Sequence, residues 1–319
     1  MIDYVTVDVF TDQRFGGNPL AVVPDARGID DTLLQKIATE FNYSETTFVF
    51  PPDDPAHTAR VRIFTPTNEI PFAGHPNVGT AFVLGRQGTA FGRPVGDRMV
   101  FEEKAGLVHL DLLRDGGAIV GTGFVAPQPL TMLGEIDRDI MAACVSLAPD
   151  AIVTSTHGPR MVSVGLPFAV AELSSLDALA SARPNTTAFE QAEQKHRHRD
   201  DRFSAFVYVR TGDGIDHLRA RMFAPLDNVP EDPATGSASA ALAAYLVSLD
   251  PRRDAVCAIT IEQGVEMGRR SLIEVEVRKR DGHVESVRIS GRCVPVMQGR
   301  IDASPGRSLT RHRASDLSA

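Results

Sequence analysis

Hydrophobic and polar residues alternate along many short stretches of this chain, a pattern typical of strands that bury one face. The first stretch covers residues 2–10, where Val5, Val7 and Val9 alternate with polar neighbours. A second begins at about Thr46, in a run rich in β-branched and aromatic residues. The same reasoning predicts strands at 20–23, 60–63, 108–112, 118–125, 161–164, 168–173, 203–209, 218–223, 259–262, 272–277, 284–289 and 293–297.

Helical spacing is less frequent. Apolar side chains fall on one helical face between Leu33 and Phe41, and Asp30 or Asp31 can cap that helix. Residues 136–144 and the Ala-rich stretch from Ser237 to Leu249 are further predicted helices. Because runs of strands are interleaved with only a few helices, the pattern predicts an α+β fold with mixed sheets and not a regular alternation of strands and helices.

One stretch of the chain is repeated at long range. Residues 62–84 read RIFTPTNEIPFAGHPNVGTAFVL, and residues 221–246 read RMFAPLDNVPEDPATGSASAALAAYL. Each copy predicts a strand, a turn with prolines, a glycine-containing loop and a helix, and each contains the pattern His/Asp-Pro-x-x-Gly-Ser/Thr-Ala. A unit repeated at so long a period indicates two related halves. If the halves face each other, His75 and Asp232 come together in one cleft.

The repeat predicts how the chain divides into domains. Residues 1–127 are expected to form an N-terminal domain and residues 128–303 a C-terminal domain, joined by a short linker with two prolines. A polar tail rich in Arg and Ser follows at 304–319. The charged run at 195–202 predicts an exposed loop inside the second domain.

Composition sets limits on the class of protein. The chain has 319 residues, 43% hydrophobic and 23% charged, which suits two globular domains. Its net charge of −8 argues against nucleic acid or an anionic membrane as the main partner. No apolar run approaches the ~18 residues of a membrane span, and the N-terminus does not resemble a signal peptide. We therefore expect a cytoplasmic protein.

Sequence signatures of several other protein classes are absent. Cys144, Cys257 and Cys293 lie far apart without a CxxC pair, so neither a zinc site nor a disulfide framework is predicted. They are interpreted as buried, small apolar residues. The chain also has no glycine-rich dinucleotide fingerprint, no P-loop and no GxSxG nucleophile elbow.

Candidate chemistry lies at the two loop-to-helix junctions of the repeat. In each copy, Gly followed by Thr or Ser stands where a helix is predicted to begin, at Gly79-Thr80 and Gly236-Ser237. Free N–H groups and the positive end of the helix dipole can hold a carboxylate there or stabilise an enolate oxygen. The alternative is that Thr80 and Ser237 are ordinary first-turn residues. Two copies, each with an ionisable residue upstream, favour a site.

Three ionisable residues are candidates for the reacting groups, and each also has an ordinary structural interpretation. His75 can handle a proton near neutral pH, or it can be a hydrogen-bonded loop residue. Asp232 can bind a substrate, or it can cap a helix. Glu45 can be an exposed carboxylate at a strand edge, or burial beside the apolar run at 48–50 can raise its pKa and make it an acid/base. Spacing alone does not choose between these interpretations.

Several short runs match one known family in order and spacing. They are GNP at 17–19, SETTFV at 44–49, RIFTP at 62–66, NE at 68–69, PFAGHP at 71–76, GTA at 79–81, GPR at 158–160, VGLP at 164–167, EDPATGSA at 231–238 and QGVEMGR at 263–269. On these runs the chain resembles the phenazine-biosynthesis isomerase (PhzF-like) family, within the diaminopimelate epimerase-like fold. The resemblance spans residues 1–302 and departs from the family at 195–202 and in the tail.

The resemblance implies an α+β fold of two similar domains. Each would be a mixed β-sheet curled around a central helix, with the active-site cleft between the domains. It also implies an isomerase that needs no metal and no cofactor, acts on a small-molecule carboxylate and forms a homodimer. In the isomerase that gives the family its name, the substrate is a dihydro-hydroxyanthranilate, and a carboxylate matching Glu45 moves a proton between ring carbons.

The same resemblance assigns roles to residues of the motifs. His75 and Asp232 would orient and polarise the substrate, and Gly236-Ser237 would hold its carboxylate. The predicted catalytic residues are Glu45, His75 and Asp232. The predicted substrate-binding residues are Asn18, Ser44, Gly74, Gly236 and Ser237.

We therefore predict an enzyme that moves a proton on a small carboxylated metabolite, cyclic and amino-bearing, with Glu45 as the shuttling acid/base. Two alternatives stay open, namely an amino-acid racemase or epimerase that uses one carboxylate, and a non-catalytic protein that binds a small molecule in the same cleft. Related epimerases use two cysteines, but the cysteines here lie outside both copies of the repeat. Glu45 has no counterpart in the second half, which favours a single shuttling carboxylate.

Overall fold

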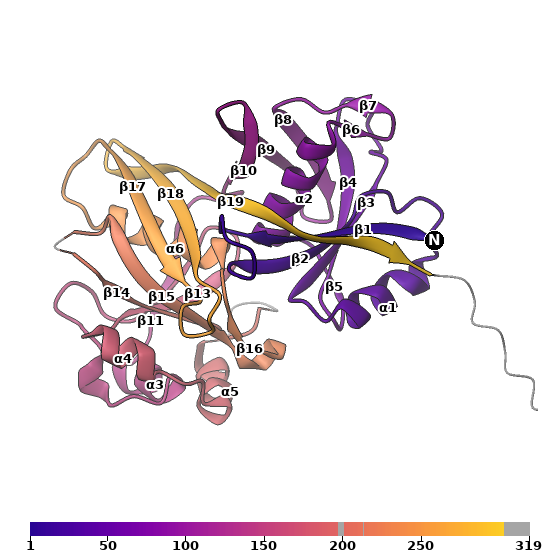
Figure 1. Ribbon diagram of the computed structural model, residues 1–319. Coiled ribbons are helices and arrows are strands. Elements are labelled where there is room, and N and C mark those ends of the chain that lie inside the picture. The colour runs from indigo at the N-terminus through magenta and orange to yellow at the C-terminus, as the bar shows by residue number, and fades with distance from the viewer. Residues whose placement is uncertain (197–200, 213, 303–319) are drawn as a thin grey trace, which may run out of the picture.

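The computed structural model of this chain describes residues 1–196, 201–212 and 214–302. Its strands and helices form two groups that lie side by side, one built from residues up to Val125 and the other from Thr131 onward (Figure 1). Both groups contain parallel as well as antiparallel strand pairs. Mixed sheets accompanied by a few helices confirm the predicted α+β class.

The first group contains two helices and most of the strands that surround them. The helices are α1 (Asp31–Phe41) and α2 (Gly74–Gln87). The strands are β1 (Ile2–Val9), β2 (Asn18–Val23), β3 (Glu45–Phe50), β4 (Ala59–Phe64), β5 (Glu69–Ile70), β6 (Thr89–Ala90), β7 (Arg93–Pro94), β8 (Arg98–Glu103), β9 (Gly106–Asp115) and β10 (Ala118–Val125).

Seven strands of the first group, together with β19, form a closed ring of pairings around α2. In order round the ring, the pairs are β1–β2, β2–β3, β3–β4, β4–β8, β8–β9, β9–β10, β10–β19 and β19–β1, where β19 is His283–Ile301. Helix α2 packs against strands on several sides of the ring, and residues 74–85 are all buried. A helix buried all round needs small or apolar residues on every face, and the sequence of α2 supplies them.

Within residues 131–196, 201–212 and 214–302, the second group contains four helices and the remaining strands. The helices are α3 (Arg138–Cys144), α4 (Leu176–Ser181), α5 (Thr186–His196) and α6 (Gly236–Ser248), with short 3₁₀ turns η1 (Pro149–Ala151) and η2 (Pro225–Asp227). The strands are β11 (Thr131–Glu135), β12 (Arg160–Ser163), β13 (Pro167–Glu172), β14 (Ala205–Arg210), β15 (His217–Ala224), β16 (Val229–Asp232), β17 (Ala255–Gln263), β18 (Ser271–Arg280) and β19.

Helices cover both faces of the second sheet. Helix α6 packs against β12, β13, β17, β18 and β19, and Val170 and Phe206 face the core that it shares. The neighbouring Ala169 and Ala205 face a second core with α3 and α5, because successive side chains of a strand point to opposite faces. Figure 1 shows α3, α4 and α5 together on one side of this group.

Strand β19 belongs to both groups. Residues 283–290 pair with β18 of the second group, 288–292 pair with β10, and 293–301 pair with β1 of the first group. The sequence pattern predicts two separate strands, at 284–289 and 293–297, and this is wrong because the chain stays extended across Gly291 as it crosses from one sheet to the other. Figure 1 shows this strand in yellow, running along both groups.

Three further sequence predictions concern the charged run, the polar tail and the cysteines. The charged run at 195–202 was expected to be a loop, but Lys195 and His196 form the end of α5. Residues 197–200 lie outside the described residues, as does the predicted tail at 304–319. Cys144 and Cys293 are buried as predicted, whereas Cys257 is only half-buried.

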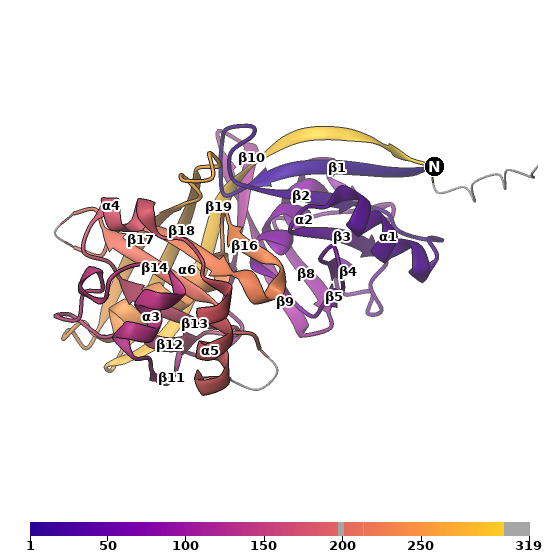
Figure 2. The ribbon, with the colours of Figure 1, turned by 90° about the horizontal axis from the view of Figure 1, so that it is seen from below.

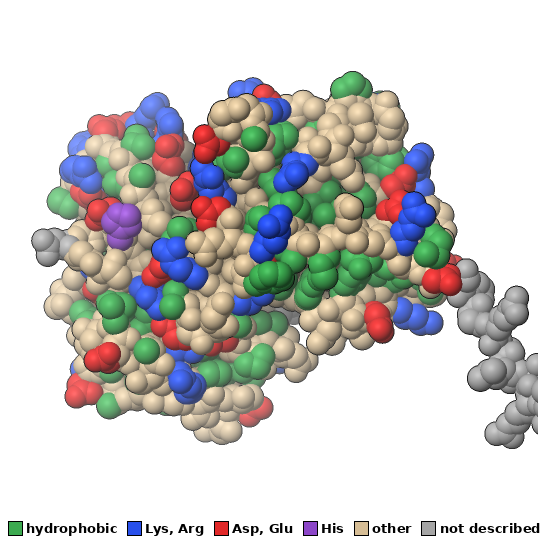
Figure 3. Space-filling model, in the orientation of Figure 1, with side chains coloured by type: hydrophobic (Ala, Val, Ile, Leu, Met, Phe, Trp, Pro, Cys, Tyr) green, Lys and Arg blue, Asp and Glu red, His purple; other side chains and the backbone are tan. Residues whose placement is uncertain are grey.

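Strand β16 lies on the side of the second group next to the first group (Figure 2). On the face drawn in Figure 3, basic and acidic side chains are interspersed, and hydrophobic side chains gather over the first group. None of the helices in the described part of the chain is both long enough and apolar enough to cross a membrane.

Candidate active site

Glu45 and His75 meet at the N-terminal end of helix α2. Glu45 is the first residue of β3, and His75 is the second residue of α2. Their facing atoms, Oε2 of Glu45 and Nε2 of His75, lie 3.4 Å apart. Only 17% of the Glu45 side chain and 6% of the His75 side chain are exposed. Of the two interpretations of Glu45, the structure therefore supports the buried carboxyl and not the surface carboxylate.

Asn18 connects this pair to the second group. Its side chain is fully buried at the start of β2, and its Nδ2 donates to Oδ1 of Asp232 at 2.9 Å and to the Ala234 carbonyl at 3.1 Å. The same nitrogen lies 3.3 Å from Nδ1 of His75, and the hydroxyl of Ser44 donates to its Oδ1 at 3.2 Å. The structure thus brings together five of the predicted site residues from both halves of the chain.

These contacts define the tautomer of His75. An amide nitrogen only donates hydrogen bonds, so Nδ1 of His75 can face Asn18 only as an acceptor, and it shares one of two amide hydrogens that also point to Asp232 and Ala234. The orientation of the Asn18 amide is itself set by two acceptors, the Asp232 carboxylate and the Ala234 carbonyl. The proton of the neutral imidazole therefore sits on Nε2, which is the nitrogen that faces Glu45.

Burial controls the protonation states of the site. Desolvation, aided by the negative charge of Asp232, raises the pKa of Glu45 to about 8. Desolvation lowers the pKa of His75 to about 3. It also raises the pKa of Asp232 to about 6, although hydrogen bonds from Thr235 and Asn18 oppose the rise. At neutral pH the close contact between Glu45 and His75 therefore joins a protonated carboxyl and a neutral imidazole, and it is not an ion pair.

The first turns of α2 and α6 face each other beside these residues. A methyl group added to Gly74 would lie 3.7 Å from the backbone nitrogen of Ser237 and 3.9 Å from Cα of Gly236. Neither helix has a side-chain cap, because Ala73 cannot provide one and Thr235 donates to Asp232 instead. The uncapped N–H groups and the positive ends of two helix dipoles thus converge on one place, which suits an anion such as a carboxylate.

The start of α2 differs from the sequence prediction. The pattern placed it at Gly79-Thr80, but α2 begins at Gly74, and Thr80 lies inside it. Pro76 permits the earlier start, because a proline in the first helical turn gives up an N–H that has no partner there. The Thr80 hydroxyl is buried 2.8 Å from the Thr47 hydroxyl and does not contribute to the anion-binding end.

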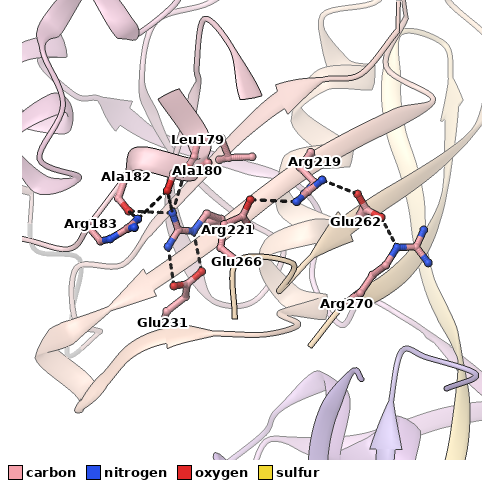
Figure 4. A network of polar contacts seen from close by, with 10 residues as sticks. All are labelled: Leu179, Ala180, Ala182, Arg183, Arg219, Arg221, Glu231, Glu262, Glu266 and Arg270. Atoms are coloured by element: carbon pink, nitrogen blue, oxygen red, sulfur yellow. Dashed lines mark hydrogen bonds and ion pairs between the residues drawn. The ribbon is translucent and has the colours of Figure 1, made fainter. Parts of the chain in front are cut away.

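Arg221 fixes the strand that carries Asp232. From β15 it forms two parallel hydrogen bonds, each 2.8 Å long, to the carboxylate of Glu231, the residue before Asp232 (Figure 4). Its remaining nitrogen donates to the carbonyls at the end of α4, among them that of Leu179. The first copy of the repeat has the same arrangement between Arg62 and Glu69, so the two halves share this clamp as well as their motifs.

Thr235 and Gln263 support Asp232 and were not predicted as site residues. The Thr235 hydroxyl donates to Oδ2 of Asp232 at 2.5 Å. Gln263 is fully buried, donates to the Asp232 carbonyl at 2.7 Å and accepts from the Thr235 N–H at 3.0 Å. Both residues lie in runs that carry the family resemblance, EDPATGSA at 231–238 and QGVEMGR at 263–269, so these motifs were the sequence signal that could have found them.

The cysteines take no part in this geometry. Cys144 and Cys293 are buried, and burial raises the pKa of each thiol, to about 12 for Cys144. Among the residues that the structure describes, no three His, Cys, Asp or Glu side chains are grouped to hold a metal ion.

Comparison with known proteins places the chain in a family. The sequence model of phenazine biosynthesis-like proteins matches residues 7–299. An uncharacterized isomerase of Mesorhizobium japonicum is 39% identical over 303 residues, covering 94% of this chain and 98% of the relative. The trans-2,3-dihydro-3-hydroxyanthranilate isomerase of Pseudomonas fluorescens is 35% identical over 302 residues, covering 94% and 99%.

A solved structure agrees with the sequence comparison at the level of the fold. The PhzF-family phenazine biosynthesis protein of Bacillus anthracis superposes with a TM-score of 0.80 at 23% identity, covering 94% of this chain and 98% of that one. The chain belongs to the phenazine biosynthesis-like (PhzF) family, as its motifs predicted. Within that family it is an isomerase.

Proposed function

We propose that this protein is a cofactor-independent isomerase that moves a proton on a small carboxylated metabolite, cyclic and amino-bearing, with Glu45 as the only shuttling group. The observation that carries the proposal is the buried contact between Glu45 and His75 at 3.4 Å. Such burial is expensive for a carboxyl unless the group has a function that needs it.

Glu45 can perform both proton transfers of an isomerisation. Because its pKa of about 8 keeps it protonated at neutral pH, it first donates the proton to a carbon of an electron-rich double bond. The carboxylate that forms then removes a proton from another carbon of the ring. One proton enters and one leaves, so the double bond moves without oxidation or reduction. The Nε2–H of His75 stabilises the carboxylate between the two transfers.

The other groups hold the substrate in this proposal. The facing first turns of α2 and α6, at Gly74 and at Gly236-Ser237, bind its carboxylate. Asp232 binds the amino group of the substrate. Its pKa of about 6 leaves it as a carboxylate at neutral pH, and this negative charge attracts a protonated or hydrogen-bonding amine. Asn18 and Ser44 orient both sets of groups through their hydrogen bonds.

We also propose the domain organisation that the family resemblance implies. Residues 1–127 and 128–303 would each form a domain with a sheet curled around a central helix, α2 or α6, with residues 288–301 of the second domain completing the sheet around α2. The substrate would enter a cleft between the domains. The burial of α2 within its ring supports this division for the first half. A homodimer is proposed as the assembly, and sedimentation velocity at micromolar concentration tests it.

Proton NMR in D₂O tests the proposed activity. The first compound to test is trans-2,3-dihydro-3-hydroxyanthranilate, because relatives of this chain carry its name. A panel of other dihydroaromatic carboxylates and cyclic amino acids accompanies it. We expect loss of a ring-proton signal, appearance of an isomer and incorporation of solvent deuterium. Glu45→Gln, which keeps the size of the side chain, is the matched control and should leave the spectra unchanged.

Other outcomes identify the alternatives. Deuterium incorporated at a stereocentre with inversion of configuration would indicate a racemase or epimerase and would contradict ring isomerisation. A compound that raises the melting temperature but shows no exchange would indicate a binding protein and would overturn the proposed enzyme.

A further inference from the structure

Arg269 reaches from the second half of the chain into the first. It lies in the loop between β17 and β18, and its Nε donates to the Gly17 carbonyl at 2.8 Å. Its Nη2 donates to the Gly16 carbonyl at 2.7 Å and to Oδ1 of Asp8 at 2.6 Å. The Asp8 side chain is only 4% exposed, and its second oxygen accepts from the Phe15 N–H at 2.6 Å. One guanidinium therefore holds the loop at 15–17 in place.

This loop ends directly before Asn18. The carbonyl that Arg269 holds belongs to the Gly17–Asn18 peptide, which is planar, so fixing that carbonyl also fixes the backbone of Asn18. The backbone at Gly17 packs closely against Val9, since a methyl group there would lie 2.3 Å from the Val9 carbonyl, and its φ of +61° requires glycine. A shift at Arg269 is therefore passed on to the Asn18 side chain.

The segment that carries Arg269 contacts the other side of the site as well. Gln263, at its start, holds Asp232 and Thr235 through the two hydrogen bonds described above and a third, which its Nε2 donates to the Thr235 hydroxyl at 3.1 Å. At its end, the Ser271 hydroxyl donates to the Pro233 carbonyl at 2.9 Å. Residues 263–271 thus support both partners of the hydrogen bond that joins the two halves.

We propose that Arg269 is a positioning residue for proton transfer. It would fix Asn18, and through Asn18 the tautomer of His75 and the orientation of Asp232. This role rests on the proposed function. The planar fork of the guanidinium is essential to it, because one side chain must donate in fixed directions to two carbonyls and a carboxylate at once. A residue that only stabilised the fold would need the positive charge beside Asp8 and not the fork.

Arg269→Lys separates the two roles. Lysine keeps a positive charge opposite Asp8, so the buried carboxylate is not left unpaired, but it cannot reproduce the three directed hydrogen bonds. Arg270→Lys is the matched control, since the Arg270 side chain is 58% exposed and pairs with Glu262 outside the site. Thermal melting of both variants shows whether the fold is kept.

The first readout needs no substrate. Protein labelled with ¹⁵N-histidine is studied by long-range ¹H–¹⁵N NMR, which reports the tautomer of each imidazole, and loss of one signal in His75→Gln assigns His75 among the nine histidines. We expect the Nε2–H tautomer for His75 in the parent protein and in Arg270→Lys, and a mixture of tautomers in Arg269→Lys. A His75 signal unchanged in Arg269→Lys would overturn the proposed role.

The second readout is the deuterium exchange described above, with the compound of the panel that exchanges fastest. Misplacement of a catalytic group by a fraction of an ångström is costly, so we expect kcat to fall about 10- to 100-fold in Arg269→Lys with a smaller change in KM. An equal fall in Arg270→Lys, or a change in KM alone, would contradict positioning. If no compound exchanges, the proposed function fails while the NMR experiment still decides the role of Arg269.

Discussion

The side-chain nitrogen of Asn18 lies 2.9 Å from a carboxylate oxygen of Asp232, although 214 residues separate them in the sequence. The same nitrogen faces His75, 57 residues away. A single buried amide therefore joins the two copies of the repeat at the point where their motifs meet. The position of the Asn18 side chain therefore determines where His75 and Asp232 lie relative to each other.

Asn18→Asp should disrupt this link without changing the size of the side chain. It replaces a donor by an oxygen that faces two acceptors, the Asp232 carboxylate and the Ala234 carbonyl. An unsatisfied buried group costs about 1–3 kcal/mol, so we expect that loss in the free energy of unfolding. The exchange rate should fall by at least about tenfold, the equivalent of about 1.4 kcal/mol in the barrier. Asn68→Asp, in an exposed turn, is the control, and equal losses in both variants would contradict the prediction.

Glu45→Gln should remove proton transfer while leaving the fold intact. A positioned acid/base contributes about 10²–10⁴-fold, so the exchange rate should fall by about that factor. The neutral amide also relieves the cost of burying an ionisable group, so the free energy of unfolding at pH 8 should not decrease. Glu40→Gln, on the exposed face of α1, is the control. Full activity in Glu45→Gln would remove Glu45 from the mechanism.

The pH dependence of kcat/KM should report Glu45. Its pKa is raised to about 8, and in the proposed sequence the protonated form acts first. Nearly all of the enzyme therefore has Glu45 protonated well below pH 8. Above that value the protonated fraction, and with it kcat/KM, falls about tenfold per pH unit. Deuterium exchange between pH 6.5 and 9.5 measures this. A rate that increases through pH 8 would show that Glu45 acts first as a base.

Glu103 should make stability depend on pH. Neither oxygen of its carboxyl has a hydrogen-bond partner of normal geometry among the described residues, and burial raises its pKa from 4.5 to about 8 against a smaller opposing effect of Asn77. Between these pH values the unfolded chain has lost the proton and the folded protein keeps it. The free energy of unfolding therefore falls by about 1.4 kcal/mol per pH unit from this group.

Glu103→Gln should remove that dependence. The variant and the parent protein should be equally stable near pH 4.5, and the variant should become the more stable one as the pH approaches 8. Urea unfolding at several pH values measures the difference. The control is Glu190→Gln on the exposed face of α5, and a difference that does not grow with pH would show that Glu103 is not held protonated.

Thiol chemistry should be dispensable. Cys144 and Cys293 are buried with raised pKa values, so they supply little thiolate at neutral pH. Cys293→Ala and Cys144→Ala should exchange deuterium at the parent rate, and labelling of the half-buried Cys257 with N-ethylmaleimide should not change it. If N-ethylmaleimide inactivated the protein and a substrate prevented that inactivation, a cysteine would instead lie in the site.

Much of this arrangement could be predicted from the repeat, and the limits have physical causes. The shared motif indicated that His75 and Asp232 meet, and the structure places both against Asn18. Burial of Glu45 could not be decided from its neighbours in sequence, because part of the surrounding protein comes from the second half. The earlier start of α2 was missed because the two copies share the Gly-Thr/Ser signal, although Pro76 is compatible with the first turn of a helix.

The final strand has a consequence for how the protein is made. The ring around α2 closes only when residues 293–301 pair with β1, so the first half lacks a strand until nearly 300 residues have been synthesised. Contacts between such distant parts of a chain form slowly, because a long loop must close first. During translation one edge of β1 therefore stays unpaired, and the sheet around α2 is completed only after residues 293–301 have been synthesised.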